Sequence, residues 1–313
     1  MRQLLNGIRI AVLGGDDREL VLIPELIRLG AIVKVVGYPE SRPELAGAEV
    51  VADILDGINN ADAVILPMPG TDEKGVIRAV YATEKIVFSE DVIKKIPPQT
   101  SIFIGTAKPF LRDLARKYNI TLIEIAEIDE IAILNSIPTA EGAVQIAMQE
   151  LPITIHGSNI FILGMGRTGF TLAHLCSAMG AHTTIVARKP GDLARGYQMG
   201  FQTMIFSDLA ENIQAAQIIY NTVPALVLTS EVLKKVKQGS LIVDLAAQPG
   251  GTDFQAAAQL GIKAILAPGL PGKVASVTAG RILAKVLPPM IKEKVAAQQT
   301  NLEVPHNEKI RRY

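Results

Sequence analysis

The chain has 313 residues, 49% of them hydrophobic, while aromatic residues make up only 4% and tryptophan is absent. This length predicts two domains, because single cores rarely grow beyond roughly 250–300 residues. Lysine plus arginine equals aspartate plus glutamate at 31 each, which excludes a global field that would favour nucleic acid or an acidic membrane. A composition rich in small and branched apolar residues is typical of parallel strands buried by helices on both faces.

The N-terminus does not resemble a signal peptide, because Asn6, Gly7 and Arg9 interrupt its apolar residues early. No stretch approaches the roughly 18 apolar residues of a membrane span. We therefore expect a soluble, cytoplasmic protein that binds neither membrane nor nucleic acid. The single cysteine, Cys176, excludes an internal disulfide and a cysteine-rich metal site, and we expect a buried structural thiol.

Strands alternate with helical patterns along the first third of the chain. A strand at Ile8–Leu13 runs into Gly14-Gly15-Asp16-Asp17-Arg18 and a helix, and further strands are expected at 31–37, 63–66, 101–105 and 121–125. This alternation predicts an α/β domain. Gly14-Gly15 lacks the third glycine of a nucleotide loop, so we interpret it as a turn facing a substrate cleft.

A connecting helix is expected next. Asn135–Gly142 opens it, Thr139 is its expected N-cap, and it runs to about Glu150 before Pro152. Its first N–H groups would then be free to bind a carboxylate.

The strongest motif follows the strand Asn159–Leu163. Gly164-Met165-Gly166-Arg167-Thr168-Gly169 has the Gly-x-Gly-x-x-Gly spacing, and an apolar helical segment follows it. The first glycine permits a tight turn, the second lets a pyrophosphate approach the backbone, and the third lets helix and strand pack closely. The motif therefore predicts dinucleotide binding at a helix N-terminus.

Six strands are expected in this second domain, at 159–163, 183–187, 202–206, 217–221, 240–245 and 263–267. Ligands of such sheets bind beyond the carboxyl ends of the strands. We therefore expect cofactor contacts at two of these exits, from Asn221, Thr222, Val223, Pro224, Asp244, Leu245 and Ala246. A last helix is expected from about Lys273 to Leu287, ended by Pro288-Pro289, with a frayed tail at 298–313.

The choice of nucleotide is predicted from the end of the second strand. NAD-binding folds place a carboxylate there, about 20 residues past the glycine turn, on the ribose 2′-hydroxyl. Here that place holds Arg188, followed by Lys189, and a guanidinium can bind a 2′-phosphate with two parallel hydrogen bonds. We therefore favour NADP over NAD, with Asp192 as a group that could reverse this preference.

These elements predict an α/β protein of two doubly wound domains with a cleft between them. We expect a flavodoxin-like substrate domain at 1–138 and a Rossmann dinucleotide-binding domain at 139–287. Residues 288–313 would be a C-terminal helix or tail that returns to the first domain or leaves it.

With these segments in hand, the chain resembles the A subunits of bacterial dipicolinate synthase. The segments that carry the resemblance are Ile10–Asp16, Asn135–Gly142, Thr154–Ser158, Leu163–Gly169, Asn221–Pro224, Pro249–Phe254 and Leu266–Gly272. The resemblance implies formation of pyridine-2,6-dicarboxylate in a sporulating mother cell, by oxidation of a dihydro or hydroxytetrahydro precursor from the lysine pathway. It also implies that the partner is the flavoprotein-like B subunit of dipicolinate synthase. A homo-oligomer is compatible with the apolar content.

Such an oxidation needs a hydride acceptor, a proton acceptor and groups that hold two carboxylates. Candidates for the carboxylates are Arg18, Lys108, Lys273 and the helix start with Ser136, Thr139 and Glu141, and we expect Arg18, Ser136, Thr139 and Lys273 to converge on the cleft opposite Thr222. Asp16 could relay a proton or hydrogen-bond its own turn.

The histidines argue against a neighbouring class of enzyme. None of the four pairs with a carboxylate at catalytic spacing, and they form no metal-ligand cluster, so we expect no metal site and no 2-hydroxy-acid dehydrogenase. The alternative from another class is a non-catalytic, cofactor-binding regulatory or scaffolding subunit.

Overall fold

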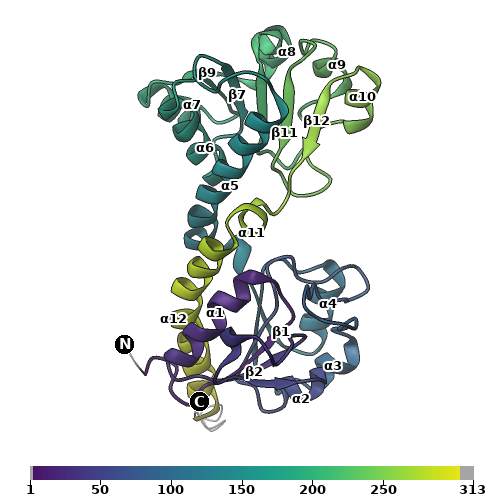
Figure 1. Ribbon diagram of the computed structural model, residues 1–313, viewed down its shortest axis with the longest axis vertical. Coiled ribbons are helices and arrows are strands. Elements are labelled where there is room, and N and C mark those ends of the chain that lie inside the picture. The colour runs from purple at the N-terminus through teal and green to yellow at the C-terminus, as the bar shows by residue number, and fades with distance from the viewer. Residues whose placement is uncertain (1–2, 304–313) are drawn as a thin grey trace, which may run out of the picture. The chain divides into compact units, whose positions relative to one another are not determined.

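The structure is a computed structural model that describes residues 3–303, with side chains to residue 298 (Figure 1). The chain divides into two compact units. Unit 1 combines the residues up to Ile131 with those from Ser276 onward, and unit 2 is Ala132–Ala275. The divisions therefore fall after 131 and 275, not after 138 and 287 as the sequence suggested.

Unit 1 is built on a six-stranded parallel sheet in the order β3-β2-β1-β4-β5-β6. Its strands are β1 (Arg9–Leu13), β2 (Ile32–Val36), β3 (Glu49–Val51), β4 (Ala63–Ile65), β5 (Ser101–Ile104) and β6 (Thr121–Glu124). This is the 3-2-1-4-5-6 order of dinucleotide-binding folds, whereas a flavodoxin-like sheet has the order 2-1-3-4-5. The flavodoxin-like expectation is therefore wrong. It failed because β3 is three residues long and half-exposed, too short for a periodic pattern.

The helices of unit 1 are α1 (Asp17–Arg28), α2 (Ile54–Ile58), α3 (Glu90–Lys94), α4 (Pro109–Lys117) and α12 (Ser276–Glu303), with short 3-10 turns at Pro43–Leu45 and Ile125–Glu127. The last helix, α12, runs beside α1 (Figure 1). A side chain at Gly280 would meet the Arg18 carbonyl oxygen at 2.7 Å, so this glycine permits the close approach of the two helices. The C-terminal helix thus returns to the first domain.

The sequence placed the end of this helix at Pro288-Pro289, but α12 continues through both. Each proline removes one backbone donor and costs roughly 3 kcal/mol in a helix interior. Four apolar side chains around the prolines are buried, Val286, Leu287, Ile291 and Val295, and each stabilises the fold by roughly 1.5–3 kcal/mol. Packing therefore outweighs propensity here. Of the tail expected at 298–313, residues up to Glu303 are helical and the remainder lies outside the described residues.

Unit 2 contains the second six-stranded parallel sheet, ordered β12-β11-β10-β7-β8-β9. Its strands are β7 (Asn159–Leu163), β8 (His182–Val186), β9 (Gln202–Met204), β10 (Ile218–Asn221), β11 (Leu241–Asp244) and β12 (Lys263–Leu266). Its helices are α6 (Arg167–Ala178), α7 (Pro190–Gln198), α8 (Leu209–Asn212), α9 (Ser230–Leu233), α10 (Phe254–Gln259) and α11 (Leu270–Val274), with 3-10 turns at Phe206–Asp208 and Ile213–Ala215. Read from β9, the order is again 3-2-1-4-5-6, which confirms two doubly wound domains, the second of Rossmann type.

The long helix α5 (Asp129–Glu150) begins ten residues before the expected N-cap Thr139, with Pro138 inside it. Ala140, Ala143, Val144 and Ala147 of α5 belong to the core of unit 2, together with apolar residues of β7, β8, β10 and β11. This buried face continues the helix past Pro138. The expected helix start at Asn135–Gly142 is therefore wrong.

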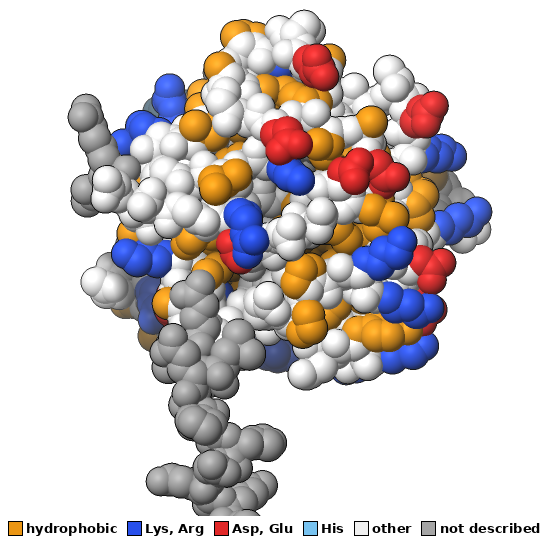
Figure 2. Space-filling view, turned by 90° about the horizontal axis from the view of Figure 1, so that it is seen from below, with side chains coloured by type: hydrophobic (Ala, Val, Ile, Leu, Met, Phe, Trp, Pro, Cys, Tyr) orange, Lys and Arg blue, Asp and Glu red, His pale blue; other side chains and the backbone are white. Residues whose placement is uncertain are grey.

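Cys176 is fully buried in the same core, and burial raises the pKa of its thiol to about 12, as expected of a structural cysteine. On the face of unit 1 seen in Figure 2, basic and acidic side chains are interspersed. Within residues 3–303, no helix is both long enough and apolar enough to cross a membrane.

Candidate functional site

The glycine turn of unit 2 has the geometry that each glycine predicts. Gly164 follows β7 with φ +97°, and a side chain there would meet the Thr222 hydroxyl oxygen at 2.5 Å. A side chain at Gly169 would collide with the carbonyl oxygen of Gly164. Gly169 therefore lets α6 pack directly against the turn after β7, and Gly164 lets the loop after β10 approach that turn.

Gly166 has a different role, because a side chain there would meet no atom within 4 Å. It faces open space and is the N-cap of α6, to which no side chain donates or accepts a cap hydrogen bond. The first N–H groups of a helix have no intrahelical partners and carry the positive end of its dipole. The turn thus fits a pyrophosphate, with Met165 buried beneath it and Arg167 and Thr168 in the first turn of the helix.

Unit 1 has the same strand order, but the matching helix start is filled. The Asp16 side chain accepts from the Arg18 N–H at 3.1 Å, and the Glu19 side chain accepts from the Asp16 N–H at 2.7 Å. A side chain at Gly15 would collide with Glu19. Two carboxylates therefore stand where the phosphates would bind in unit 1, so the dinucleotide site belongs to unit 2.

The end of β8 carries two cations. Arg188 and Lys189 are exposed, and neither has an ion-pair or hydrogen-bond partner among the described side chains. Lys189 is the N-cap of α7, with Pro190 in its first turn. Asp192 lies in that first turn as well, half-exposed. The arrangement leaves a guanidinium and an ammonium without a described partner at the strand end where the sequence predicts nucleotide selection.

Asn221 and Asp244, at the ends of β10 and β11, are fully buried and hold the loops together. Asp244 accepts four hydrogen bonds, from Asn221 Nδ2 (2.9 Å), Ala246 N (3.1 Å), Gly251 N (2.8 Å) and Thr252 Oγ1 (2.7 Å). Asn221 also accepts from the Val223 N–H at 3.0 Å. The prediction that these two side chains contact the cofactor directly is therefore wrong, since their polar atoms already have hydrogen-bond partners inside the protein.

The remaining predicted contacts of these exits are of two kinds. The Thr222 hydroxyl donates to the Leu163 carbonyl oxygen at 2.8 Å and so fixes the loop beside the glycine turn. Val223 and Leu245 are half-buried, Pro224 is exposed and Ala246 is buried. As cofactor contacts, Val223, Pro224 and Leu245 stay predictions.

In unit 1, Asp16 and Arg18 form an ion pair in which both guanidinium contacts measure 2.8 Å. The side chain of Arg18 is only 8% exposed and that of Asp16 15%. Burial raises the pKa of Asp16, but the guanidinium of Arg18 more than offsets this and leaves the pKa below its usual value. Asp16 is thus both a helix cap and an ion-pair partner, so it is not a free proton acceptor.

Beneath this pair lies Glu19, which sequence reasoning missed. It is 1% exposed, and burial raises the pKa of its carboxyl to about 7. The Tyr38 hydroxyl, also buried, donates to the Gly14 carbonyl oxygen at 2.6 Å. The capping-box spacing of Asp16 and Glu19 is the sequence signal that could have identified this carboxyl.

The other predicted substrate ligands are not brought together by a helix start. Lys108 pairs with Glu73 at 3.1 Å, with 40% of its side chain exposed. Inside α5, Ser136 donates to the Ile133 carbonyl oxygen at 2.6 Å and Thr139 to the Asn135 carbonyl oxygen at 2.7 Å. These side chains and Glu141 lie mid-helix, where the backbone N–H groups are already used, so capture of a carboxylate by free N–H groups there is wrong.

Lys273 lies in the short helix α11, exposed and without a partner among the described side chains. Its contact with a substrate carboxylate stays a prediction. The same is true of the expected convergence of Arg18, Ser136, Thr139 and Lys273.

The fold and the glycine turn together define a two-domain α/β protein with a Rossmann-type dinucleotide-binding unit. In agreement, residues 135–312 match the family described as alanine dehydrogenase/PNT, C-terminal domain. Residues 9–126 match the N-terminal domain of the dipicolinate synthase A subunit.

The chain belongs to the family of dipicolinate synthase A subunits. It is 40% identical to the dipicolinate synthase A subunit of Bacillus subtilis strain 168 over 93% of this chain and 98% of that protein. The crystal structure of the A subunit from Bacillus halodurans superposes with a TM-score of 0.87, at 39% identity over 92% of this chain and 98% of that one. A transhydrogenase from Sinorhizobium meliloti shares only the fold, with a TM-score of 0.62 at 16% identity over 94% of each chain.

Proposed function

We propose that this protein is the pyridine-nucleotide-dependent oxidoreductase component of dipicolinate synthase. It would form pyridine-2,6-dicarboxylate from a dihydro or hydroxytetrahydro dicarboxylate precursor, in the cytoplasm of a sporulating mother cell and together with the B subunit. The observation that carries the proposal is the uncapped N-terminus of α6 behind Gly164, Gly166 and Gly169, in a member of this family.

Aromatisation of a dihydropyridine removes one hydride and one proton from the ring. The bound nicotinamide supplies the hydride acceptor. A hydroxytetrahydro precursor is already at the same oxidation level and becomes the dihydropyridine by losing water. The residues of this chain have three tasks: α6 holds the pyrophosphate, the Asn221–Asp244 network orients the loops beside the glycine turn, and cations hold the two carboxylates.

The preferred nucleotide in this proposal is NADP, with NAD as the second choice. Among the described side chains, Arg188 and Lys189 have no carboxylate partner, so they can receive a 2′-phosphate without breaking an ion pair there. We expect Arg188→Glu to weaken NADP binding strongly and to spare NAD, as measured by titration of the purified protein. Arg195→Glu, on α7 past its first turn, is the matched charge control. Equal loss of both nucleotides, or of neither, would show that this strand end does not choose the cofactor.

One observation favours the non-catalytic alternative. Among the described residues, the candidate proton acceptor is engaged, because Asp16 is paired with Arg18. A cofactor-binding scaffold would not need a free base. This alternative predicts that chemistry occurs only in the partner protein.

The test incubates the purified protein, first alone and then with the B subunit, in the presence of the precursor and either nucleotide. Reduction of the nucleotide at about 340 nm by this chain alone, together with formation of the aromatic dicarboxylate, supports the proposal. If this chain never reduces nucleotide while the isolated partner makes the product, the scaffolding function is correct.

A further inference from the structure

The carboxyl ends of β1 and β4 in unit 1 are joined by hydrogen bonds between their exit loops. The chain reverses direction in the strand order between these two strands, and doubly wound sheets bind their ligands at this point. The Gly15 N–H donates to the Arg78 carbonyl oxygen at 2.8 Å, and the Val80 N–H donates to the Gly15 carbonyl oxygen at 2.9 Å. The Arg78 N–H donates to the Gly70 carbonyl oxygen at 3.2 Å. The backbone of Arg78 is therefore fixed on both sides at the edge where a ligand would bind.

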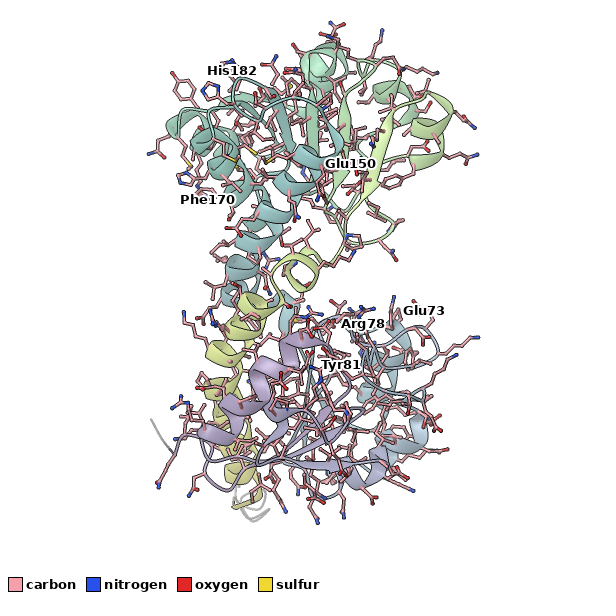
Figure 3. The ribbon with its side chains drawn as sticks, viewed as in Figure 1. Glu73, Arg78, Tyr81, Glu150, Phe170 and His182 are labelled. Atoms are coloured by element: carbon pink, nitrogen blue, oxygen red, sulfur yellow. The ribbon has the colours of Figure 1, made fainter. Side chains whose placement is uncertain are left out.

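The packing of this segment is close. A side chain at Gly14 would meet Ile77 at 2.8 Å and the Arg78 carbonyl oxygen at 2.9 Å. Arg78 and Tyr81 lie on the same side of unit 1 (Figure 3). The ring of Tyr81 is itself held, because its hydroxyl bonds to Asp17 and the guanidinium of Arg42 lies 4.3 Å from its centroid. Arg78 therefore projects from a rigid support.

The guanidinium of Arg78 is exposed and has no partner among the described residues. This distinguishes it from most arginines of unit 1. Those with a carboxylate or ring partner are Arg9, Arg18, Arg28, Arg42, Arg112 and Arg116. Arg281 of α12 is also without a partner, but it lies outside the strand exits. Within the described part of unit 1, Arg78 is thus the unpaired arginine at the ligand-binding edge.

Its charge already acts on the neighbouring ion pair, since Arg78 contributes to lowering the pKa of Asp16. Arg18 is less available to an incoming carboxylate, because Asp16 already holds its Nε and a terminal nitrogen and its side chain is only 8% exposed. Breaking a buried pair is costly, whereas a free guanidinium offers two parallel donors at no such cost.

We propose that Arg78 is a specificity-determining residue that binds one carboxylate of the dicarboxylate substrate, while the Asp16–Arg18 pair stays intact beneath it. The inference rests on the proposed function, which supplies the dicarboxylate. The inference assigns the carboxylate contact to Arg78 in place of the predicted ligands Arg18 and Lys108, although no sequence motif identifies Arg78.

The test measures binding of pyridine-2,6-dicarboxylate to the full-length protein by calorimetry, and compares it with pyridine-2-carboxylate, which lacks the second carboxylate. In the wild type the dicarboxylate should bind at least about tenfold more tightly than the monocarboxylate. Arg78→Ala should abolish this difference, and Arg78→Lys should retain part of it, because an ammonium cannot form the bidentate contact. Arg281→Ala, at the other unpaired arginine in the described part of unit 1, should leave the difference unchanged.

An unchanged ratio in Arg78→Ala would overturn the inference, as would a wild type that binds neither compound. Both readouts are independent of turnover. If the ratio behaves as expected but the protein never reduces nucleotide, the carboxylate site stands and the proposed oxidation fails. If turnover is intact and the ratio does not change, the oxidation stands and Arg78 is an ordinary surface cation.

Discussion

Replacement of Asp244 tests whether one buried carboxylate holds the loops of unit 2 in place. Its oxygens accept four hydrogen bonds at 2.7–3.1 Å, and the residue is 0% exposed. Alanine leaves the backbone N–H groups of Ala246 and Gly251 without an acceptor, while the side chains of Thr252 and Asn221 can rotate to other acceptors. At roughly 1–3 kcal/mol for each orphaned donor, we expect Asp244→Ala to destabilise unit 2 by about 4 kcal/mol. Asparagine keeps one acceptor oxygen, so Asp244→Asn should cost about half as much.

The assay must report on unit 2 alone, because unfolding of a two-domain chain is not a single two-state step. Hydrogen exchange of peptides covering 218–252, followed by mass spectrometry, gives such a local free energy. Asp208→Ala, an exposed aspartate of the same unit, is the control and should change stability by less than about 0.5 kcal/mol. If the alanine and asparagine variants cost the same, or if neither exceeds the control, the carboxylate does not hold these loops.

Three further outcomes are expected. Gly169→Ala drives a methyl group into the backbone of Gly164, so it should lower the stability of unit 2 by about 1–3 kcal/mol and weaken nucleotide binding in titrations. Gly191→Ala, where a side chain meets no atom, is the control and should change neither. Arg18→Ala should cost roughly 3 kcal/mol in urea unfolding of unit 1, the lower end for a buried pair because Asp16 keeps 15% exposure, and a loss below about 1 kcal/mol would contradict this. Burial raises the pKa of Glu19 from 4.5 to about 7, so the folded protein keeps a proton that the unfolded chain has lost. The stabilisation from this bound proton is complete below pH 4.5 and is lost as the pH rises through about 7. It amounts to about 1.4 kcal/mol per unit of pKa difference. Unfolding curves of Glu19→Gln should lack this decline in stability.

The strands of both sheets were predictable because parallel strands buried on both faces are continuous apolar runs. Of the strands in the described chain, only β3 escaped; β9 is equally short and equally exposed and was predicted, so burial alone does not explain the difference. The glycine turn was predictable for a similar reason. A side chain at Gly164 would meet the Thr222 hydroxyl and one at Gly169 would collide with the Gly164 carbonyl oxygen, while Gly166 faces open space.

The errors share a physical cause, which is that local rules gave way to packing. Prolines mark helix ends because they lack a donor, yet Pro138, Pro288 and Pro289 lie inside long helices. Polar residues at strand exits were assigned to ligands, yet Asn221 and Asp244 satisfy each other and the loop backbone. Arg78 was missed for the opposite reason, since it lies in an irregular segment whose place at the sheet edge is set by long-range hydrogen bonds.

Two sheets with one strand order differ in what occupies the start of the first helix, and this difference divides their functions. In unit 2 the N-cap is Gly166, without a side chain, so the positive end of α6 is open to an anion. In unit 1 the N-cap is Asp16, and Glu19 fills the space that Gly15 leaves, so α1 already has its anion. The Asp16 carboxylate also pairs with Arg18, which leaves Arg78 as the available arginine at the carboxyl edge of the sheet in unit 1. The identity of the N-cap residue thus accounts for two features of unit 1: its first helix has no open phosphate-binding site, and Arg78 is where it can bind a carboxylate.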